Sequence, residues 1–299
     1  MNAIEIRNLT KSFGEKQAVS GLNMTVPEGA IYGFIGENGS GKSTTEKIIC
    51  GLIHESGGSV KLYGKPHTDS DIRANMGVLI EAPGCFPGLS VWNNMMLQAA
   101  NLGIENAEKE IIKVLKTVRM GGAAGNKYKN CSLGMKQRIG IAMALLGNPR
   151  LLVLDEPING LDADGMRIMR DVLTDIAKSG STILISSHVL GELEKIATHY
   201  GIIRGGRMIA EMTAEELDAS CRRFVALTAR NMELTKALLR AKYTRVEADE
   251  AGYLRVYDEV GPVEIVEYLY ASGIAVTEIK TDKIGLEEYY IDLMKEAKR

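Results

Sequence analysis

The segment Gly36 to Ser43 reads GENGSGKS and limits the possible folds of this chain more than any other stretch. It fits the pattern G-x-x-x-x-G-K-[ST], in which glycines let the backbone wrap a phosphate chain with its N–H groups pointing inward. The apolar run Ala30 to Ile35 precedes the segment and a helical pattern follows it, which is the context that the motif requires. The sequence therefore predicts a nucleotide-phosphate loop on an α/β fold, against the alternative of a glycine-rich turn that fits by chance.

The motif also predicts what its side chains do. We expect Lys42 to reach the β- and γ-phosphates and the Ser43 hydroxyl to bind Mg²⁺. The start of the following helix adds partial positive charge toward the same phosphates. The expected nucleotide contacts in this segment are Gly36, Glu37, Asn38, Gly39, Ser40, Gly41, Lys42, Ser43 and Thr44.

Short apolar runs alternate with amphipathic helical patterns up to about residue 212, which is the pattern of an α/β domain. The predicted buried strands are 30–35, 75–80, 151–154 and 182–186. The predicted helices between them are 43–50, 163–178 and 189–197. Residues 84–147 interrupt the alternation and predict an inserted helical subdomain, with Ser90 and Ser132 as helix starts. Gly205 and Gly206 predict a hairpin between 200–204 and 207–211.

The pattern changes from residue 213 onward, so we expect two domains, 1–212 and 213–299. The second reads β-α-β-β-α-β-α and resembles a ferredoxin-like module. Its predicted strands are 224–228, 244–248, 253–257 and 274–279, and its predicted helices are 232–241, 263–271 and 286–297. No catalytic motif is recognisable in it. We therefore expect a small accessory or regulatory α+β module.

Charge and cysteine usage narrow the class of protein. The chain has 36 basic and 38 acidic residues and a net charge of −2, which does not favour a nucleic-acid partner. Cys50, Cys85, Cys131 and Cys221 show no paired spacing and predict reduced thiols in a cytosolic protein. No apolar run approaches the roughly 20 residues that a membrane helix needs, and no signal pattern opens the chain. We expect a cytoplasmic protein, and any membrane part must come from another chain.

A second motif, LLVLDEP, occupies residues 151–157. Four apolar residues predict a buried strand that carries an acidic pair to its carboxyl end, the edge at which open α/β sheets bind ligands. We expect Asp155 to hold Mg²⁺ through water and Glu156 to polarise the attacking water. A strand followed by an acidic turn is the alternative, and the phosphate-loop motif makes it less favourable.

The third motif identifies a family. Residues 131–138 read CSLGMKQR and resemble the ABC signature, usually L-S-G-G-Q, at the start of a helix. Leu133 replaces the first glycine and Met135 the glutamine, whereas Ser132 and Gly134 are kept. We expect Ser132 to cap the helix and offer its hydroxyl to a γ-phosphate, with Gly134 beside it. A serine-capped helix without a nucleotide role is the alternative.

The position of this motif supports the resemblance to ABC ATPases. Ser132 lies 90 residues after Lys42 and shortly before Asp155, as the family requires. Membership implies a P-loop NTPase fold with a RecA-like α/β core, an inserted helical subdomain and an antiparallel β portion. It also implies ATP and Mg²⁺ as bound groups, and hydrolysis of ATP to ADP and phosphate coupled to transport.

Three smaller matches complete the family pattern. Asn159 to Asp162 resembles the D-loop, and His188 matches the histidine that senses the γ-phosphate. Phe13 stands where the family places an aromatic residue that stacks on adenine, and base stacking on an aromatic contributes roughly 1–3 kcal/mol. A surface histidine and a core phenylalanine are the respective alternatives.

One residue departs from the usual family pattern. Glu81 stands where ABC ATPases usually have a glutamine, after the strand predicted at 75–80. Glutamate offers a charged oxygen to Mg²⁺ or the attacking water, so we expect Glu81 to act as a catalytic and metal-binding residue. This glutamate, the altered signature and the C-terminal extension resemble the bacitracin and lantibiotic self-protection ATPases. The resemblance is specific over 1–212 and rests on length and pattern over 213–299.

The resemblance implies partners. ABC ATPases form head-to-tail dimers that enclose ATP between the phosphate loop of one copy and the signature of the other. Homodimer and heterodimer with a close relative both remain open. A membrane-spanning permease is implied as the second partner, at the inner face of the membrane. Its expected contact is the segment 86–96, with apolar Phe86, Leu89, Val91 and Trp92, and the alternative for each is an internal core position.

Two other functions compete with export of a substrate such as a peptide antibiotic. An ABC importer subunit would carry the same motifs. A non-transport ABC ATPase of the translation-factor kind usually has two cassettes in one chain, and the chromosome-associated kind inserts long heptads between the phosphate loop and the signature. This chain has one cassette and no sustained heptads, so we favour a transporter subunit.

Overall fold

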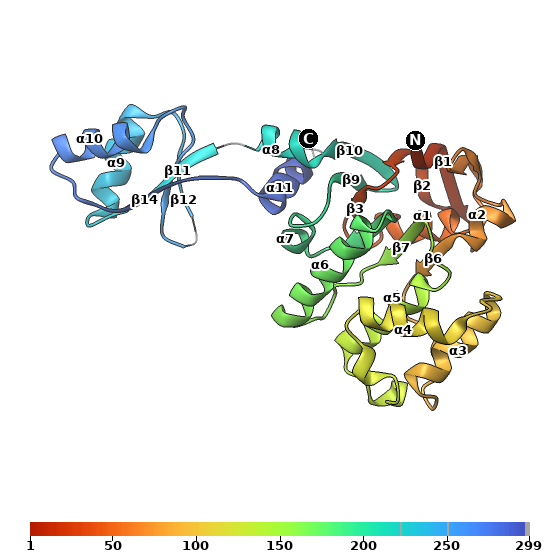
Figure 1. Ribbon diagram of the computed structural model, residues 1–299. Coiled ribbons are helices and arrows are strands. Elements are labelled where there is room, and N and C mark those ends of the chain that lie inside the picture. Colours follow the sequence, from red (N-terminus) through yellow and green to blue (C-terminus); the bar gives the residue numbers. More distant parts are fainter. Residues whose placement is uncertain (222, 250, 297–299) are drawn as a thin grey trace. The chain divides into compact units, whose positions relative to one another are not determined.

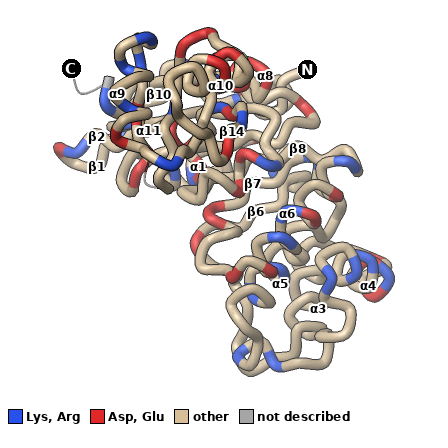
Figure 2. The backbone as a smooth tube through the Cα atoms, turned by 90° about the vertical axis from the view of Figure 1, so that its left-hand side faces the viewer, with Lys and Arg blue, Asp and Glu red and all other residues tan. Residues whose placement is uncertain are grey.

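The computed structural model describes residues 1–221, 223–249 and 251–296 (Figure 1). It contains two compact units, Met1–Ala214 and Glu215–Arg299. The domain boundary predicted between residues 212 and 213 lies between the last two residues of β10 (Arg207–Thr213). Acidic and basic residues are interspersed in the structure, and both occur on α4 (Figure 2).

A six-stranded sheet with the order β10-β9-β3-β8-β7-β6 forms the centre of the first unit. Its remaining strands are β3 (Ile31–Ile35), β6 (Met76–Leu79), β7 (Leu151–Asp155), β8 (Thr182–Ser187) and β9 (His199–Arg204). All neighbours are parallel except β9 and β10, which form the predicted hairpin. β3, β7 and β8 are buried along their whole length, which explains the apolar runs that make up most of each strand.

A second sheet of the first unit has the order β2-β1-β4-β5 and is antiparallel. Its strands are β1 (Asn2–Phe13), β2 (Lys16–Pro27), β4 (Gly57–Leu62) and β5 (Lys65–Pro66). Apolar side chains from β1, β2 and β4 share one core with β3 and α1 (Lys42–Ile49). The antiparallel portion expected for a P-loop NTPase of this kind is thereby confirmed.

Helices complete the first unit. Beside α1 they are α2 (Ser70–Ala74), α6 (Ala163–Lys178) and α7 (Leu190–Leu193). The prediction of a helix over 189–197 was too long. The backbone N–H of Thr198 donates to the carbonyl oxygen of Ile31 at 2.8 Å, so the chain must leave the helix early to join β3.

The inserted helical subdomain consists of α3 (Val91–Asn101), α4 (Ala107–Thr117), α5 (Leu133–Leu145) and the 3-10 turns η1 (Gly121–Ala123) and η2 (Tyr128–Asn130). These segments lie together in Figure 1, drawn in yellow and light green. Both predicted helix starts are confirmed, because the Ser90 hydroxyl accepts from the N–H of Asn93 at 3.1 Å and the Ser132 hydroxyl from that of Met135 at 3.3 Å.

The second unit has an antiparallel sheet with the order β12-β13-β11-β14, the order of a ferredoxin-like module. Its elements are β11 (Arg223–Ala229), α9 (Met232–Lys242), β12 (Val246–Ala248), β13 (Leu254–Val256), α10 (Pro262–Ala271), β14 (Val276–Lys283) and α11 (Leu286–Glu296), and α8 (Ala214–Ser220) precedes them. Leu239 of α9 and Leu269 of α10 pack against Val225 and Leu227 on one face of this sheet.

The strand predicted at 274–279 in fact begins two residues later and extends to Lys283. The Ile274 N–H donates to the carbonyl oxygen of Leu269 at 2.8 Å and so closes the end of α10, and the Ile274 side chain is buried. The strand can therefore start only after Ile274. At its far end Lys283 pairs with Arg223, so β14 spans the whole of β11.

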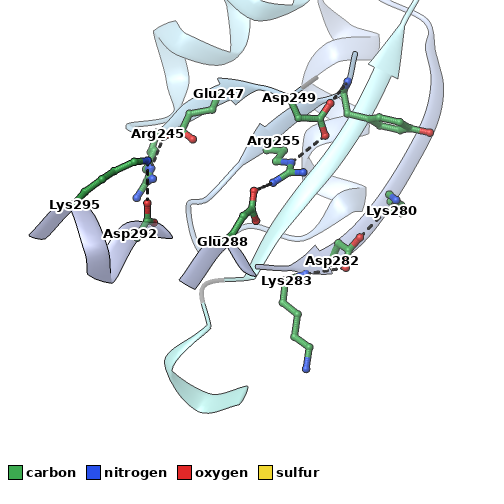
Figure 3. A network of polar contacts seen from close by, with 11 residues as sticks. Arg245, Glu247, Asp249, Arg255, Lys280, Asp282, Lys283, Glu288, Asp292 and Lys295 are labelled. Atoms are coloured by element: carbon green, nitrogen blue, oxygen red, sulfur yellow. Dashed lines mark hydrogen bonds and ion pairs between the residues drawn. The ribbon is translucent and has the colours of Figure 1, made fainter. Parts of the chain in front are cut away.

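Arg255 joins three elements of the second unit (Figure 3). Its guanidinium donates to Asp249 at 3.0 Å and to Glu288 of α11 at 2.5 Å. The same group lies 4.6 Å from the ring centroid of Phe224 on β11. Arg255 and Asp249 are mostly buried, with side-chain exposures of 21% and 15%, so solvent screens this pair less than an exposed one.

We expect Arg255→Met to destabilise the second unit by about 1–3 kcal/mol, because it removes the cationic partner of the mostly buried Asp249 carboxylate. Urea denaturation followed by far-UV circular dichroism measures the effect. Trp92, the single tryptophan, belongs to the first unit, so its fluorescence transition should not move. The control is Lys280→Met, which breaks an exposed pair with Asp282 and should cost less than about 0.5 kcal/mol. Equal losses in the two variants would contradict the assigned role of Arg255.

Candidate functional site

The phosphate loop lies between β3 and α1, and its glycines are required by space as well as by backbone angles. A Cβ atom on Gly36 would lie 2.5 Å from the carbonyl oxygen of Ile203. Gly41 has φ +110°, and its Cβ atom would lie 2.7 Å from the carbonyl oxygen of Ala18. Neither position accepts another residue without movement of the backbone, so the loop has the close-packed turn that the motif predicts.

Lys42 lies across this loop. Its ammonium donates to the carbonyl oxygens of Gly36 at 2.6 Å and Glu37 at 3.2 Å, and the side chain is buried. No side chain caps the start of α1, so its first N–H groups are free to bind an anion. Glu37, Asn38 and Gly39 are exposed, Ser40 is buried, and Thr44 is half-buried on the first turn of α1. This arrangement fits the phosphates of a nucleotide.

The acidic strand end lies beside the phosphate loop. The Ser43 hydroxyl is 3.4 Å from Oδ2 of Asp155, and the Ser186 hydroxyl donates to Oδ1 of Asp155 at 2.8 Å. The structure thus brings together two of the predicted metal ligands, Ser43 and Asp155. A hydroxyl beside a carboxylate is the oxygen donor set that Mg²⁺ prefers, so these residues fit the ion.

Glu156 and His188 also lie together. Nδ1 of His188 is 2.8 Å from Oε2 of Glu156, and the backbone N–H of His188 donates to the same oxygen at 3.3 Å. Glu156 has φ +50°, and its own N–H donates to the Ser186 hydroxyl at 3.2 Å. These contacts hold the carboxylate of Glu156 in one orientation at the end of β7.

Glu81 is bound to a lysine. Lys47, on the last turn of α1, donates to Oε1 of Glu81 at 2.7 Å. This hydrogen bond and the charge of Lys47 lower the pKa of Glu81. The side chain is 69% exposed and φ is +64°. Its contact with a metal remains a prediction.

Phe13 stands at the end of β1 and is 52% exposed, so the alternative of a core phenylalanine is wrong. The Lys11 ammonium lies 4.9 Å from its ring centroid. Ser132 and Gly134 line a cavity of about 430 Å³ together with residues 160–162 of the expected D-loop. No phosphate-loop residue lines that cavity, so within one chain the signature and the phosphate loop do not form one pocket.

A groove of about 330 Å³ lies where the helical subdomain meets the central sheet. It is lined by Ile80 and Pro83 from residues 80–84 (the Glu81 segment), by Leu102, and by Gly140 of α5. Phe86, in the predicted permease contact, is 61% exposed, whereas Val91 is fully buried. The prediction that Val91 takes part in a docking surface was therefore wrong, because Val91 faces the core of the subdomain.

Sequence reasoning missed Glu46. This residue of α1 is fully buried, and neither of its carboxyl oxygens has a hydrogen-bond partner within the described residues. Burial raises its pKa well above the ordinary value, and the negative charge of Asp155 raises it further. Its spacing of four from Lys42 was the available signal, because residues at that spacing share one helix face.

We expect Glu46→Gln to stabilise the protein increasingly as the pH rises. A raised pKa means that the folded state binds the proton more tightly than the unfolded state, so wild-type stability falls as the pH rises above the ordinary glutamate value. The loss is at most about 1.4 kcal/mol per pH unit. Thermal unfolding without nucleotide between pH 5 and 8, measured beside the exposed Glu105→Gln as a control, tests this. A stability difference between Glu46→Gln and wild type that stays constant with pH would contradict it.

Comparison with known proteins places these features in a family. The sequence profile described as "ABC transporter" matches residues 19–159. The bacitracin transport ATP-binding protein BcrA of Bacillus licheniformis is 34% identical over 297 residues, covering 97% of either chain. The lantibiotic transport ATP-binding protein SrtF of Streptococcus pyogenes is 40% identical over 217 residues, covering 73% of this chain and 92% of that one.

A solved structure shows the same fold. It is a dimeric ATP-binding cassette bound to ADP and Pi in a post-hydrolysis state, with a TM-score of 0.64 and 24% identity, covering 71% of this chain and 98% of the other. None of the described helices is long and apolar enough to cross a bilayer. This chain belongs to the ABC transporter family of ATP-binding proteins, and it is a subunit that binds and hydrolyses ATP.

Proposed function

We propose that this chain powers the export or removal of a peptide antibiotic through a separate membrane permease. The observation that carries the proposal is the similarity to the bacitracin transport ATP-binding protein, which extends over 97% of both chains and so includes the C-terminal unit. An importer subunit is the second candidate, since an importer requires the same hydrolytic residues. The two differ in the partner, because an importer works with a separate substrate-binding protein.

The geometry supports the following roles for the residues in ATP hydrolysis. Lys42 and the first N–H groups of α1 bind the β- and γ-phosphates, and Phe13 stacks on the adenine. Ser43 and Asp155 would hold Mg²⁺, which when bound would supply positive charge against the phosphates. Glu156 accepts a proton from the attacking water, and His188 keeps the Glu156 carboxylate in place. Because Glu81 is exposed and paired with Lys47, we propose that it acts at the edge of this site rather than at its centre.

The position of the signature supports a dimer. Ser132 caps α5 and lines a cavity in which no phosphate-loop residue takes part. One copy alone therefore does not provide both sets of hydrogen-bond donors to a single γ-phosphate. We propose that the signature of a second copy, or of a close relative, completes each site, as ABC ATPase subunits dimerise.

The permease contact is assigned to the groove beside the Glu81 segment. Leu102 there is 43% exposed, Val78 38% and nearby Phe86 61%, so apolar side chains are open to a partner at this place. A groove edged by exposed apolar side chains and backbone polar groups accepts a short amphipathic helix. Binding at this groove would hold the chain on the inner face of the membrane.

The C-terminal unit is proposed to be an accessory or regulatory module. None of the assigned nucleotide or metal contacts lies in residues 215–299. The Arg255→Met variant should accordingly keep wild-type ATP turnover in the isolated subunit at temperatures where the unit stays folded.

Glu156→Gln should keep nucleotide binding and lose turnover by about 10²–10⁴-fold, because the amide cannot accept the proton of the attacking water. The variant should then accumulate as an ATP-bound dimer, visible by size-exclusion chromatography with MgATP. Phosphate release is measured in the complex purified from membranes, with Glu105→Gln as the control. Wild-type turnover in Glu156→Gln would overturn the assignment of the base.

Leu102→Asp should reduce the amount of permease that co-purifies with this chain about tenfold or more, because it places a charge in an apolar contact. Ile112→Asp makes the same change on α4, where the side chain is 60% exposed and does not line the groove. Quantitative mass spectrometry of the purified complex compares the two. Equal recovery would move the permease contact away from the groove, and co-purification with a substrate-binding protein would favour the importer.

A further inference from the structure

Glu81 and Lys47 form an ion pair between two parts of the first unit that are far apart in sequence. Lys47 Nζ and Glu81 Oε1 are 2.7 Å apart, although the residues are separated by 34 positions. Lys47 is the only basic residue in the last turn of α1. Its side chain is 33% exposed, so its stem packs against the protein while its charge reaches the loop.

Lys47 lies on α1, the helix that begins at the phosphate loop. It follows Ser43 by four residues on α1, so the two side chains share one face of the helix, one turn apart. Four residues correspond to about 6 Å along the helix axis between the backbones of Ser43 and Lys47. The ion pair holds the Glu81 carboxylate against α1, the helix that begins at the phosphate loop, and the lysine charge offsets the negative charge of that carboxylate.

The Glu81 segment is tied at its other end to the permease groove. Pro83 packs so closely on Gly140 of α5 that a Cβ atom at Gly140 would lie 2.6 Å from Cγ of Pro83. Ile80 and Ala82, the neighbours of Glu81, both line the groove. A movement of Glu81 relative to α1 therefore changes the lining of the groove directly.

We propose that Lys47 is the positioning residue for Glu81, and that their ion pair couples the phosphate-binding helix to the groove that receives the permease. The inference rests on the proposed role of that groove. Exposed ion pairs add little to folding stability, so the pair acts through the position it gives to a strained loop residue at φ +64°. Lys47 itself touches neither nucleotide nor metal in this scheme.

Hydrogen exchange of the peptide that contains residues 80–84 tests the positioning step without any permease. Lys47→Glu should accelerate exchange about two- to thirtyfold, the range expected for residues that couple two sites. Lys47→Arg and the charge-swapped double variant Lys47→Glu/Glu81→Lys should stay within about twofold of wild type, because both keep opposite charges in place. Lys178→Glu, on the last turn of α6, is the matched control and should change nothing.

Permease-stimulated ATP hydrolysis of the complex purified from membranes tests the coupling step. The stimulated kcat of Lys47→Glu should fall by about the same two- to thirtyfold while KM for MgATP changes less than about twofold. A merely structural role would not divide the effect between kcat and KM in this way. Lys47→Arg should restore the stimulated rate.

Unchanged exchange in Lys47→Glu, or acceleration that neither Lys47→Arg nor the charge swap reverses, would overturn the inference. A wild-type stimulated kcat in Lys47→Glu would overturn it as well. Failure of the proposed function would give a different result: ATP hydrolysis by the wild-type protein would then not be stimulated by any co-purified membrane protein. The exchange measurement would still decide whether Lys47 positions Glu81.

Discussion

The parallel register of β3, β7 and β8 is the constraint on which the site depends. Ile35 pairs with Ser187 and Asp155 with Ser186, so the three strands end at one edge of the sheet. The phosphate loop leaves this edge from β3, Glu156 follows β7, and His188 follows β8. Because a parallel sheet places all its carboxyl ends on the same side, residues more than 100 positions apart meet without any further folding element.

Local sequence was sufficient to predict this arrangement because each strand is fully buried. The apolar runs 151–154 and 183–185 differ from helical periodicity, and the phosphate-loop motif stands between a strand and a helix, the context that it requires. The same holds for the caps at Ser90 and Ser132, whose hydroxyls satisfy backbone groups a few residues away. Features that arise within a single element were thus accessible to sequence reasoning.

Features that depend on packing between elements could not be predicted from the sequence. Val91 is apolar and follows a helix cap, and nothing in that pattern says whether it faces the core or a partner. Glu46 has the sequence of an ordinary helix glutamate, yet burial against Asp155 makes it a raised-pKa group. The ion pair between Lys47 and Glu81 links α1 to the loop after β6, and no periodicity in the sequence indicates that these two residues meet.

Two acidic residues that follow strands have a strained backbone conformation, and contacts from other elements hold each of them. Glu156 and Glu81 both have positive φ, a conformation that costs a non-glycine residue roughly 1 kcal/mol or more. Each is held by contacts from another element: Glu156 by Ser186 and His188, and Glu81 by Lys47. Glu156 is fixed by partners on β8 and directly after it, a fully buried strand, whereas Glu81 is fixed by one flexible side chain. The carboxylate proposed as the base is therefore held by contacts from a buried strand, whereas the carboxylate beside the groove depends on a single half-exposed lysine.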